Sequence, residues 1–283
     1  QRLAGVPPVC RLMESRVDGQ PADAVSLKDR GLAYGDGLFE TIAVRRGLPV
    51  LLDRHLQRLA KGCQRLAINL DHDAMATELL AYARELDEGV LKLIVTRGDG
   101  LRGYAFDPSA QARRILSGNP PAVYPAAHAE QGVRLFPCTT RLSIQPLLAG
   151  LKHLNRLEQV IARAEWRDTE HAEGLMLDQA GRVIEGVFSN LFLVRNGELI
   201  TADLKRCGVE GVMRAEILFQ AESLGIPTQI TDITLEQLQW ADEVFVCNSV
   251  YGIWPVHAYA ALSWPVGPLT RKLQTIARAL LDA

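Results

Sequence analysis

The sequence lacks the features of several protein classes. Its 31 Lys and Arg residues are nearly balanced by 33 Asp and Glu residues, which leaves a net charge of -2 over 283 residues. Proteins that bind nucleic acid or an anionic membrane through charge carry a large basic excess, so we expect neither partner. No apolar run approaches the roughly 20 residues that a transmembrane helix needs. The first residues, QRLAGVPPVC, lack the apolar core of a signal peptide.

Cysteine and histidine are too scattered to indicate two further kinds of site. The cysteines are odd in number and none belongs to a CxxC pair, so no disulfide framework is expected. They are Cys10, Cys63, Cys138, Cys207 and Cys247. The six histidines form no HxxxH or HExxH pair, so the sequence predicts no metal site. These absences together predict a protein of the reducing cytoplasm.

The composition and the order of apolar patterns favour an α/β fold. Hydrophobic residues make up 48% of the chain and charged residues 23%, as in ordinary globular proteins. Strand and helix patterns alternate on both sides of GNPPAVYPAAHAEQG (118–132), which has three prolines and no periodicity. We therefore predict two mixed α/β domains, over 1–118 and 132–283, joined by a linker over 119–131.

Hydrophobic periodicity places the individual elements. Two apolar runs flank Arg46 and Gly47 and predict a hairpin. An amphipathic helix follows over 53–68, with leucines on one face. Further helices are expected over 73–86, 154–168, 212–225, 235–241 and 268–282. Further strands are expected over 90–97, 112–117, 133–139, 174–178, 181–186, 188–194, 198–201, 227–231 and 243–248.

The stretch GDGLRG (98–103) matches the pattern GxGxxG after a strand, but we reject a dinucleotide site there. Such a site needs a helix directly after the glycines, so that its amide groups face the pyrophosphate. The following residues, YAFDPSA, contain a proline and no helical apolar stripe. A loop is the expected structure, and Arg97 and Arg102 are its chemically useful residues.

Lys152 has two possible roles. It follows an Ala-Gly pair and precedes a helical pattern that includes Leu154, Leu157 and Ile161. A lysine in this position can be a solvated surface cation, or it can be a nucleophile that forms imines. The local pattern by itself does not decide between these two interpretations.

The segment LAGLKHLNRLEQV around Lys152 resembles the lysine motif of the aminodeoxychorismate lyases, pyridoxal-phosphate enzymes of fold type IV. Branched-chain and D-amino-acid transaminases share that fold but lack the HLNRLEQ run. Other stretches similar to the family occur in the same order: DRGLAYGDGLFET, HLQRL, LKLIVTRGDGLRGY, RVIEGVFSNLF, GVEGVMR and EVFVCNS. The resemblance implies two mixed α/β domains with the active site between them, and a homodimer.

The resemblance also implies a pyridoxal 5'-phosphate site. Lys152 would hold the cofactor and then carry protons, and Glu185 would keep the pyridine nitrogen protonated. The start of the helix near 212 would bind the phosphate with its backbone. The implied phosphate contacts are Arg58, Gly211, Val212, Met213, Asn248 and Ser249.

For the substrate, the resemblance implies 4-amino-4-deoxychorismate, a small diacid that is converted to 4-aminobenzoate and pyruvate in folate biosynthesis. Arg102 and Arg156, together with Asn155, are the implied substrate contacts, because arginine binds carboxylates well. Each arginine could instead make a structural salt bridge. Two alternatives stay open: an amino-acid transaminase on the same fold, and a non-catalytic protein that has kept the fold.

Overall fold

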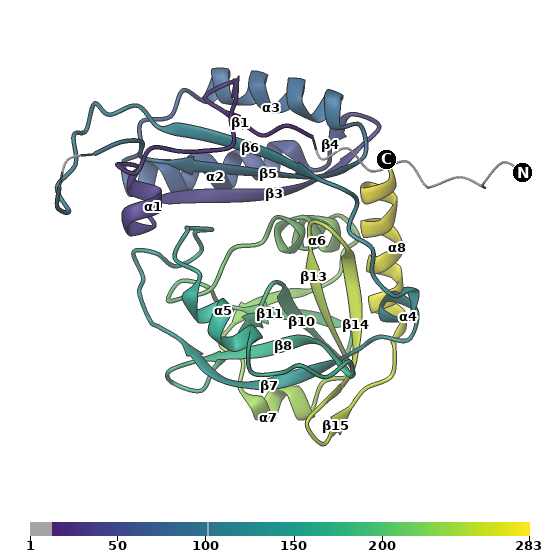
Figure 1. The fold of residues 1–283 in the computed structure, drawn as a ribbon. Helices are drawn as coiled ribbons and strands as arrows, with labels where there is room; N and C mark the ends of the chain where they lie inside the picture. The colour runs from purple at the N-terminus through teal and green to yellow at the C-terminus, as the bar shows by residue number, and fades with distance from the viewer. Residues whose placement is uncertain (1–12, 101) are drawn as a thin grey trace, which may run out of the picture.

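The computed structural model describes residues 13–100 and 102–283, so Cys10 and QRLAGVPPVC lie outside the described residues. Its first part is an antiparallel sheet, drawn at the top of Figure 1, in the order β2-β1-β6-β5-β3-β4. The strands are β1 (Arg16–Val17), β2 (Gln20–Pro21), β3 (Gly37–Arg45), β4 (Leu48–Pro49), β5 (Gly89–Thr96) and β6 (Arg113–Asn119). Helices α2 (Leu52–Leu66) and α3 (His72–Leu86) pack on this sheet, and their apolar faces bury its core.

The second sheet has the order β12-β11-β10-β13-β14-β7-β8-β9, with β15 beside β14. Because β9 pairs with both β8 and β10, the strands between them form a closed ring around a large apolar core. The strands are β7 (Val133–Leu142), β8 (His171–Asp178), β9 (Val183–Gly186), β10 (Asn190–Arg195), β11 (Glu198–Ala202), β12 (Thr228–Thr231), β13 (Glu243–Asn248), β14 (Gly252–Tyr259) and β15 (Leu262–Ser263). The α/β fold class expected from the sequence is thereby confirmed.

The remaining helices are α1 (Arg30–Tyr34), α4 (Ala126–Glu130), α5 (Leu157–Arg163), α6 (Val212–Ser223), α7 (Leu235–Gln239) and α8 (Pro268–Asp282). In Figure 1, α6 lies between the two sheets and α8 runs along one side of the molecule. Helix α6 packs against α2 and α8, and α8 also contacts β14 and β3. None of the described helices is long and apolar enough to span a membrane.

Two turn and helix predictions are confirmed by clear local causes. Arg46 and Gly47 have φ values of 50° and 72°, and two consecutive residues with positive φ favour a tight hairpin between β3 and β4. The last helix begins at Pro268, as expected, because proline suits the first helical turn.

The predicted helix over 154–168 is wrong in its bounds, because α5 spans only Leu157–Arg163. The residues before it are held in extended form against β3. The N–H of Phe39 donates to the carbonyl of Lys152 at 2.9 Å, and the N–H of Leu154 donates to that of Gly37 at 3.0 Å. The apolar stripe also faces outward, since Leu157 is 73% exposed.

Six further elements were not expected from the sequence: β1, β2, α1, α4, β14 and β15. The linker contains α4, the approach to β3 contains α1 with Asp29 as its N-cap, and β14 follows directly after β13. The two sheets separate between the end of β6 and the start of β7, but helices α2 and α8 make contacts across this division. The proposed domain bounds of 1–118, 119–131 and 132–283 therefore stay a prediction.

Candidate active site

A cavity of about 610 Å³ lies between the first sheet and the ring of the second. It is lined by Phe39 and Thr41 of β3, by the segment around Lys152 and α5, and by loops at the ends of β9, β13 and the start of α6. The cavity brings together eight of the residues singled out from the sequence: Lys152, Arg58, Arg156, Glu185, Gly211, Val212, Asn248 and Ser249.

Lys152 has the properties of an amine that can lose its proton near neutral pH. Its Nζ lies 4.4 Å from the centroid of the Phe39 ring. Burial, together with the positive charges of Arg58 and Arg156, lowers the pKa of Lys152 from the usual 10.5 to about 8. A lysine needs its neutral form to act as a nucleophile or base, so this environment suits either role.

Glu185 is a buried acid without a matching cation. It is 3% exposed, and it accepts a hydrogen bond from the N–H of Val209 at 2.8 Å and a longer one from Asn190 Nδ2 at 3.4 Å. Burial raises the pKa of Glu185 to about 7, because these donors and the more distant cations do not offset it. A protonated nitrogen base placed against this carboxylate would supply the missing charge.

The start of α6 offers donors for an anion. Gly211 is its N-cap, and none of the described side chains caps it, so the first amide groups have no intrahelical partners. Gly211 is required here, since a Cβ would lie 1.9 Å from Asn190 Oδ1. The side chain of Met213 is buried in the core, so only its backbone can serve a ligand.

The other phosphate candidates stand around this helix start. Arg58 reaches it from α2 and donates from Nη1 to the carbonyl of Glu210 at 3.1 Å. Asn248 accepts from the N–H groups of Val250 and Tyr251, and this turn holds Ser249, whose Oγ donates to the carbonyl of Thr41 at 3.2 Å. Helix amides, a guanidinium and a hydroxyl form a donor set that fits a phosphate group.

The structure separates the three substrate candidates. Arg156 lines the cavity, and its Nε donates to the carbonyl of His153 at 2.8 Å. Asn155 instead lines a neighbouring cavity of about 240 Å³, and its amide donates to the carbonyl of Gly35. Arg102 is exposed on its loop and is not among the lining residues. Their roles in substrate binding stay predictions.

The loop over 98–106 is not a dinucleotide site, because no helix follows it in the described residues from 102 to 112. Arg97 is also buried rather than available to a ligand. It pairs with Asp36 and donates to the carbonyls of Leu66 and Ala67. Arg97 therefore anchors the base of the loop.

Among the cavity residues that were missed in the sequence are Thr41, Tyr124, Gln159, Arg163 and Phe188. Periodicity could have indicated three of them. Thr41 shares a strand face with Phe39, and Gln159 and Arg163 follow Arg156 at helical spacing. Tyr124 had no such signal, because it belongs to the linker and is placed by edge contact with Trp254 at 4.9 Å.

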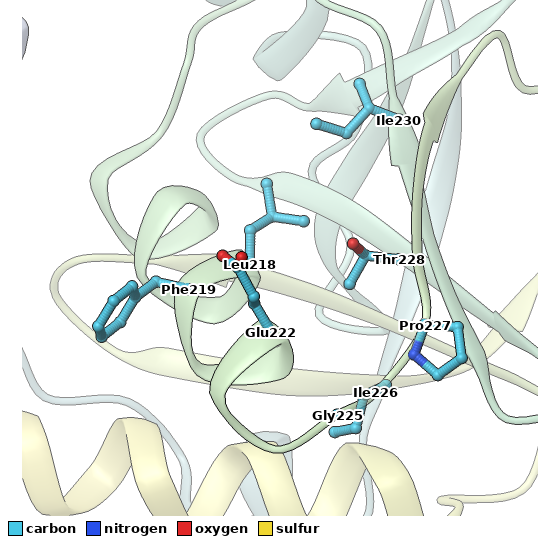
Figure 2. Close-up of a pocket in the computed structure, with 8 residues that line it drawn as sticks. All are labelled: Leu218, Phe219, Glu222, Gly225, Ile226, Pro227, Thr228 and Ile230. Carbon is cyan, nitrogen blue, oxygen red and sulfur yellow. The ribbon is translucent and has the colours of Figure 1, made fainter.

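A second hollow of about 600 Å³ lies between the end of α6 and β12 (Figure 2). Its lining is Leu218, Phe219, Glu222, Gly225, Ile226, Pro227, Thr228 and Ile230. Glu222 is the only ionisable side chain of this set, so the groove lacks a catalytic constellation. No group of His, Cys, Asp and Glu that could hold a metal occurs within residues 13–100 and 102–283.

Known proteins similar to this chain include one family match, two aminodeoxychorismate lyases and an aminotransferase. Residues 37–259 match the family Amino-transferase class IV. The chain is 40% identical to an aminodeoxychorismate lyase of Vibrio harveyi, over 91% of this chain and 97% of that one. A solved 4-amino-4-deoxychorismate lyase from Pseudomonas aeruginosa is 64% identical, with a TM-score of 0.93 over 95% of this chain and 100% of the other. A putative branched-chain-amino-acid aminotransferase of Methanocaldococcus jannaschii is 31% identical, over 88% of each chain.

Proposed function

The chain belongs to the amino-transferase class IV family, and we propose that it is a pyridoxal-phosphate-dependent aminodeoxychorismate lyase. Its reaction would convert 4-amino-4-deoxychorismate into 4-aminobenzoate and pyruvate, a step toward folate. The observation that carries the proposal is the meeting of Lys152 and Glu185 in one cavity between the sheets. The 64% identity to a lyase favours this reaction over the others of the family.

The residues of the cavity fit the cofactor. When bound, pyridoxal phosphate accepts the electron pair that remains when a proton leaves the carbon next to an amine. Lys152 would hold it covalently, and Glu185 would pair with its ring nitrogen. The phosphate would lie among Arg58, Ser249, Asn248 and the amides of 211–213, where the donors converge.

Lys152 would then act as the proton carrier. Its neutral Nζ would take the proton from the carbon that bears the amine of the substrate. The carbon–oxygen bond to the enolpyruvyl group would break, and transfer of the proton from Lys152 to the methylene carbon of that group would give pyruvate. Because the remaining ring becomes aromatic, the reaction runs downhill, and the task of the protein is orientation and proton transfer.

The cavity carries more positive than negative side chains, which suits a diacid. Arg156 and Arg163 lie at opposite ends of α5 on the side that lines the cavity. We propose that Arg156 binds one substrate carboxylate. Asn155 and Arg102 lie outside the cavity lining and would contribute only if the chain rearranges or pairs with a second copy.

A homodimer would explain the exposed apolar side chains beside the cavity. Leu147, Leu157, Val160 and Ile161 are 75%, 73%, 60% and 56% exposed, and they would be covered by a second copy of the chain. The free thiols of Cys63, Cys138, Cys207 and Cys247 fit the cytoplasmic location that we propose.

A transaminase is the second candidate, favoured by the 31% identity to the putative branched-chain enzyme. It would use the same lysine and acid but would stop after one half-reaction without a keto acid. The deciding experiment supplies purified protein with 4-amino-4-deoxychorismate alone. We expect 4-aminobenzoate and pyruvate in equal amounts over many turnovers. Rapid amino exchange between glutamate or D-alanine and a keto acid, with no 4-aminobenzoate, would establish the transaminase instead.

A further inference from the structure

A buried ion cluster lies behind the cavity, between β3 and α2. Glu40 is 1% exposed and accepts hydrogen bonds from His55 Nδ1 at 2.6 Å and Arg58 Nε at 2.8 Å, and a further one from Arg58 Nη2. Phe39 and Thr41 line the cavity, so Glu40, between them on the strand, points to the opposite face. Neither Glu40 nor His55 is among the residues that line the cavity.

The two hydrogen bonds from Arg58 to Glu40 leave the other edge of the guanidinium free. A guanidinium can bind an oxyanion through its Nε and Nη2 edge or through its Nη1 and Nη2 edge. Glu40 takes the first edge, and the carbonyl of Glu210 takes one N–H of Nη1. One N–H on each terminal nitrogen remains, and Arg58 lines the cavity beside the start of α6. The orientation of the free edge is therefore fixed by the carboxylate behind it.

His55 fixes the carboxylate in turn. It lies one turn before Arg58 on α2 and is 0% exposed. Its Nε2 is buried and has no hydrogen-bond partner in the described part of the chain. Burial lowers the pKa of His55, so the neutral ring donates through Nδ1 and leaves only a lone pair unpartnered. A charged ring would leave a buried N–H without an acceptor, which is costlier.

We propose that Glu40 and His55 are positioning residues, which orient Arg58 so that its free edge binds the phosphate of the cofactor. The inference rests on the cofactor of the proposed function but not on the reaction, since a lyase and a transaminase would use the phosphate contact alike. Neither residue touches the cofactor. Both act through the guanidinium of Arg58.

The test compares two probes that differ only in the phosphate. Pyridoxal 5'-phosphate and pyridoxal are titrated against cofactor-free protein, and each dissociation constant is measured by absorbance. We expect Glu40→Gln to weaken binding of the phosphorylated probe by roughly 10- to 100-fold and to change pyridoxal binding by less than about 2-fold. Equal weakening of both probes would overturn the proposal, because it would show a general structural role.

A second test asks whether Glu40 acts through Arg58. Arg58→Ala should show the same selectivity for the phosphorylated probe. Because Glu40 acts through Arg58, the double variant Glu40→Gln with Arg58→Ala should bind no more weakly than Arg58→Ala alone. Additive losses would contradict the inference. Should Glu40→Gln fail to fold, Glu40→Asp, which keeps the charge but retracts it, is expected to show a smaller loss with the same selectivity.

His55 allows a matched pair of variants. The amide nitrogen of Asn can stand where Nδ1 stands, so His55→Asn should keep the affinity for pyridoxal 5'-phosphate within about 3-fold. His55→Leu removes the donor and should lose roughly 3- to 10-fold for the phosphorylated probe alone. Equal affinities of the two variants would reduce His55 to a packing residue and refute its part in the proposal.

An ion pair between α3 and β6, away from the cavity, serves as a control for the loss of a buried carboxylate–arginine contact. Glu78 accepts hydrogen bonds from Arg114 Nε at 2.9 Å and Nη2 at 2.8 Å, and neither residue lines the cavity. Glu78→Gln should leave both dissociation constants unchanged. If the parent protein binds neither probe, the proposed function fails. If it binds pyridoxal 5'-phosphate tightly and Glu40→Gln does not alter its preference over pyridoxal, only the inference fails.

Discussion

The two sheets beside the cavity each hold a buried carboxylate, Glu185 in the cavity lining and Glu40 behind it, and the partners of these two acids differ. Glu40 of the first sheet has cationic and neutral donors from α2, and these outweigh the effect of burial and lower its pKa to about 2. Glu185 of the second sheet has mainly one backbone donor, and burial raises its pKa to about 7. The first acid is satisfied within the protein. The second lacks a positive partner, which a bound cofactor would provide.

The largest effect is expected where the cavity has no substitute for the group removed. Lys152→Ala should abolish turnover, since no other lysine lines the cavity. The fold should survive, because one residue before a short helix contributes little to the core. After borohydride reduction of the loaded parent protein, mass spectrometry should find the cofactor on Lys152. A label on Lys28, Lys61, Lys92, Lys205 or Lys272 would contradict the assignment.

The second largest effect is expected on turnover when Glu185 is replaced. Glu185→Gln should lower kcat by about 100-fold or more, the usual scale for loss of one electrostatic stabiliser at a reacting centre. Its cofactor affinity should fall only modestly, because the phosphate contacts remain. Steady-state kinetics with saturating cofactor measures this directly. Unchanged turnover would reduce Glu185 to a structural strand residue.

Stability should distinguish the acids by opposite dependence on pH. The lowered pKa of Glu40 contributes stability above about pH 4.5 that is lost as the pH falls toward 2, so Glu40→Gln should destabilise the protein at pH 8. The raised pKa of Glu185 costs stability as the pH rises from about 4.5 to 7, so Glu185→Gln should stabilise cofactor-free protein at pH 8.

We expect each of these differences to be about 1 to 3 kcal/mol at pH 8, and the gain in Glu185→Gln to disappear at pH 4.5. Urea unfolding at the two pH values gives the numbers. Glu173 is a second buried acid with its pKa raised to about 7, so part of the slope should persist in Glu185→Gln. A destabilised Glu185→Gln at pH 8 would show that the acid is already well matched by the protein.

The smallest predicted effect lies at the substrate. Arg156→Ala should raise KM by roughly 10-fold through loss of one charge-assisted contact. It should also raise the pKa of Lys152, since the positive charge of Arg156 lowers it. The pH at which kcat rises should therefore shift to a higher value. Arg167→Ala is the control, because Arg167 is exposed and does not line the cavity. The same KM in both variants would remove Arg156 from the substrate site.

Much of the fold was predictable because its signals are local. The last helix has Pro268 at its start and Leu273, Ala277 and Leu281 on its buried face, a pattern that sequence alone contains. Strand β14 was missed because Pro255 interrupts an otherwise apolar run, and proline usually argues against an inner strand. The bounds of α5 were wrong because backbone bonds to β3, which no local pattern reveals, hold the residues before it.

In the site, too, the residues within motifs were predictable and the long-range contacts were not. Lys152, Glu185 and Arg58 were singled out from motifs, and the fold brings them into one cavity. The acid that holds Arg58 was not foreseen, because Glu40 meets His55 and Arg58 only when β3 packs on α2. Tyr124 was equally hidden, since it reaches the cavity from a linker without periodicity.

The most direct test of the difference between the two acids is the protonation state of the bound cofactor. Nitrogen-15 NMR of the loaded protein, with label in the pyridine ring, reports whether that nitrogen carries a proton. We predict a protonated nitrogen in the parent protein and in Glu40→Gln, and an unprotonated one in Glu185→Gln. A protonated nitrogen in Glu185→Gln, or an unprotonated one in the parent protein, would contradict the role that we assign to Glu185.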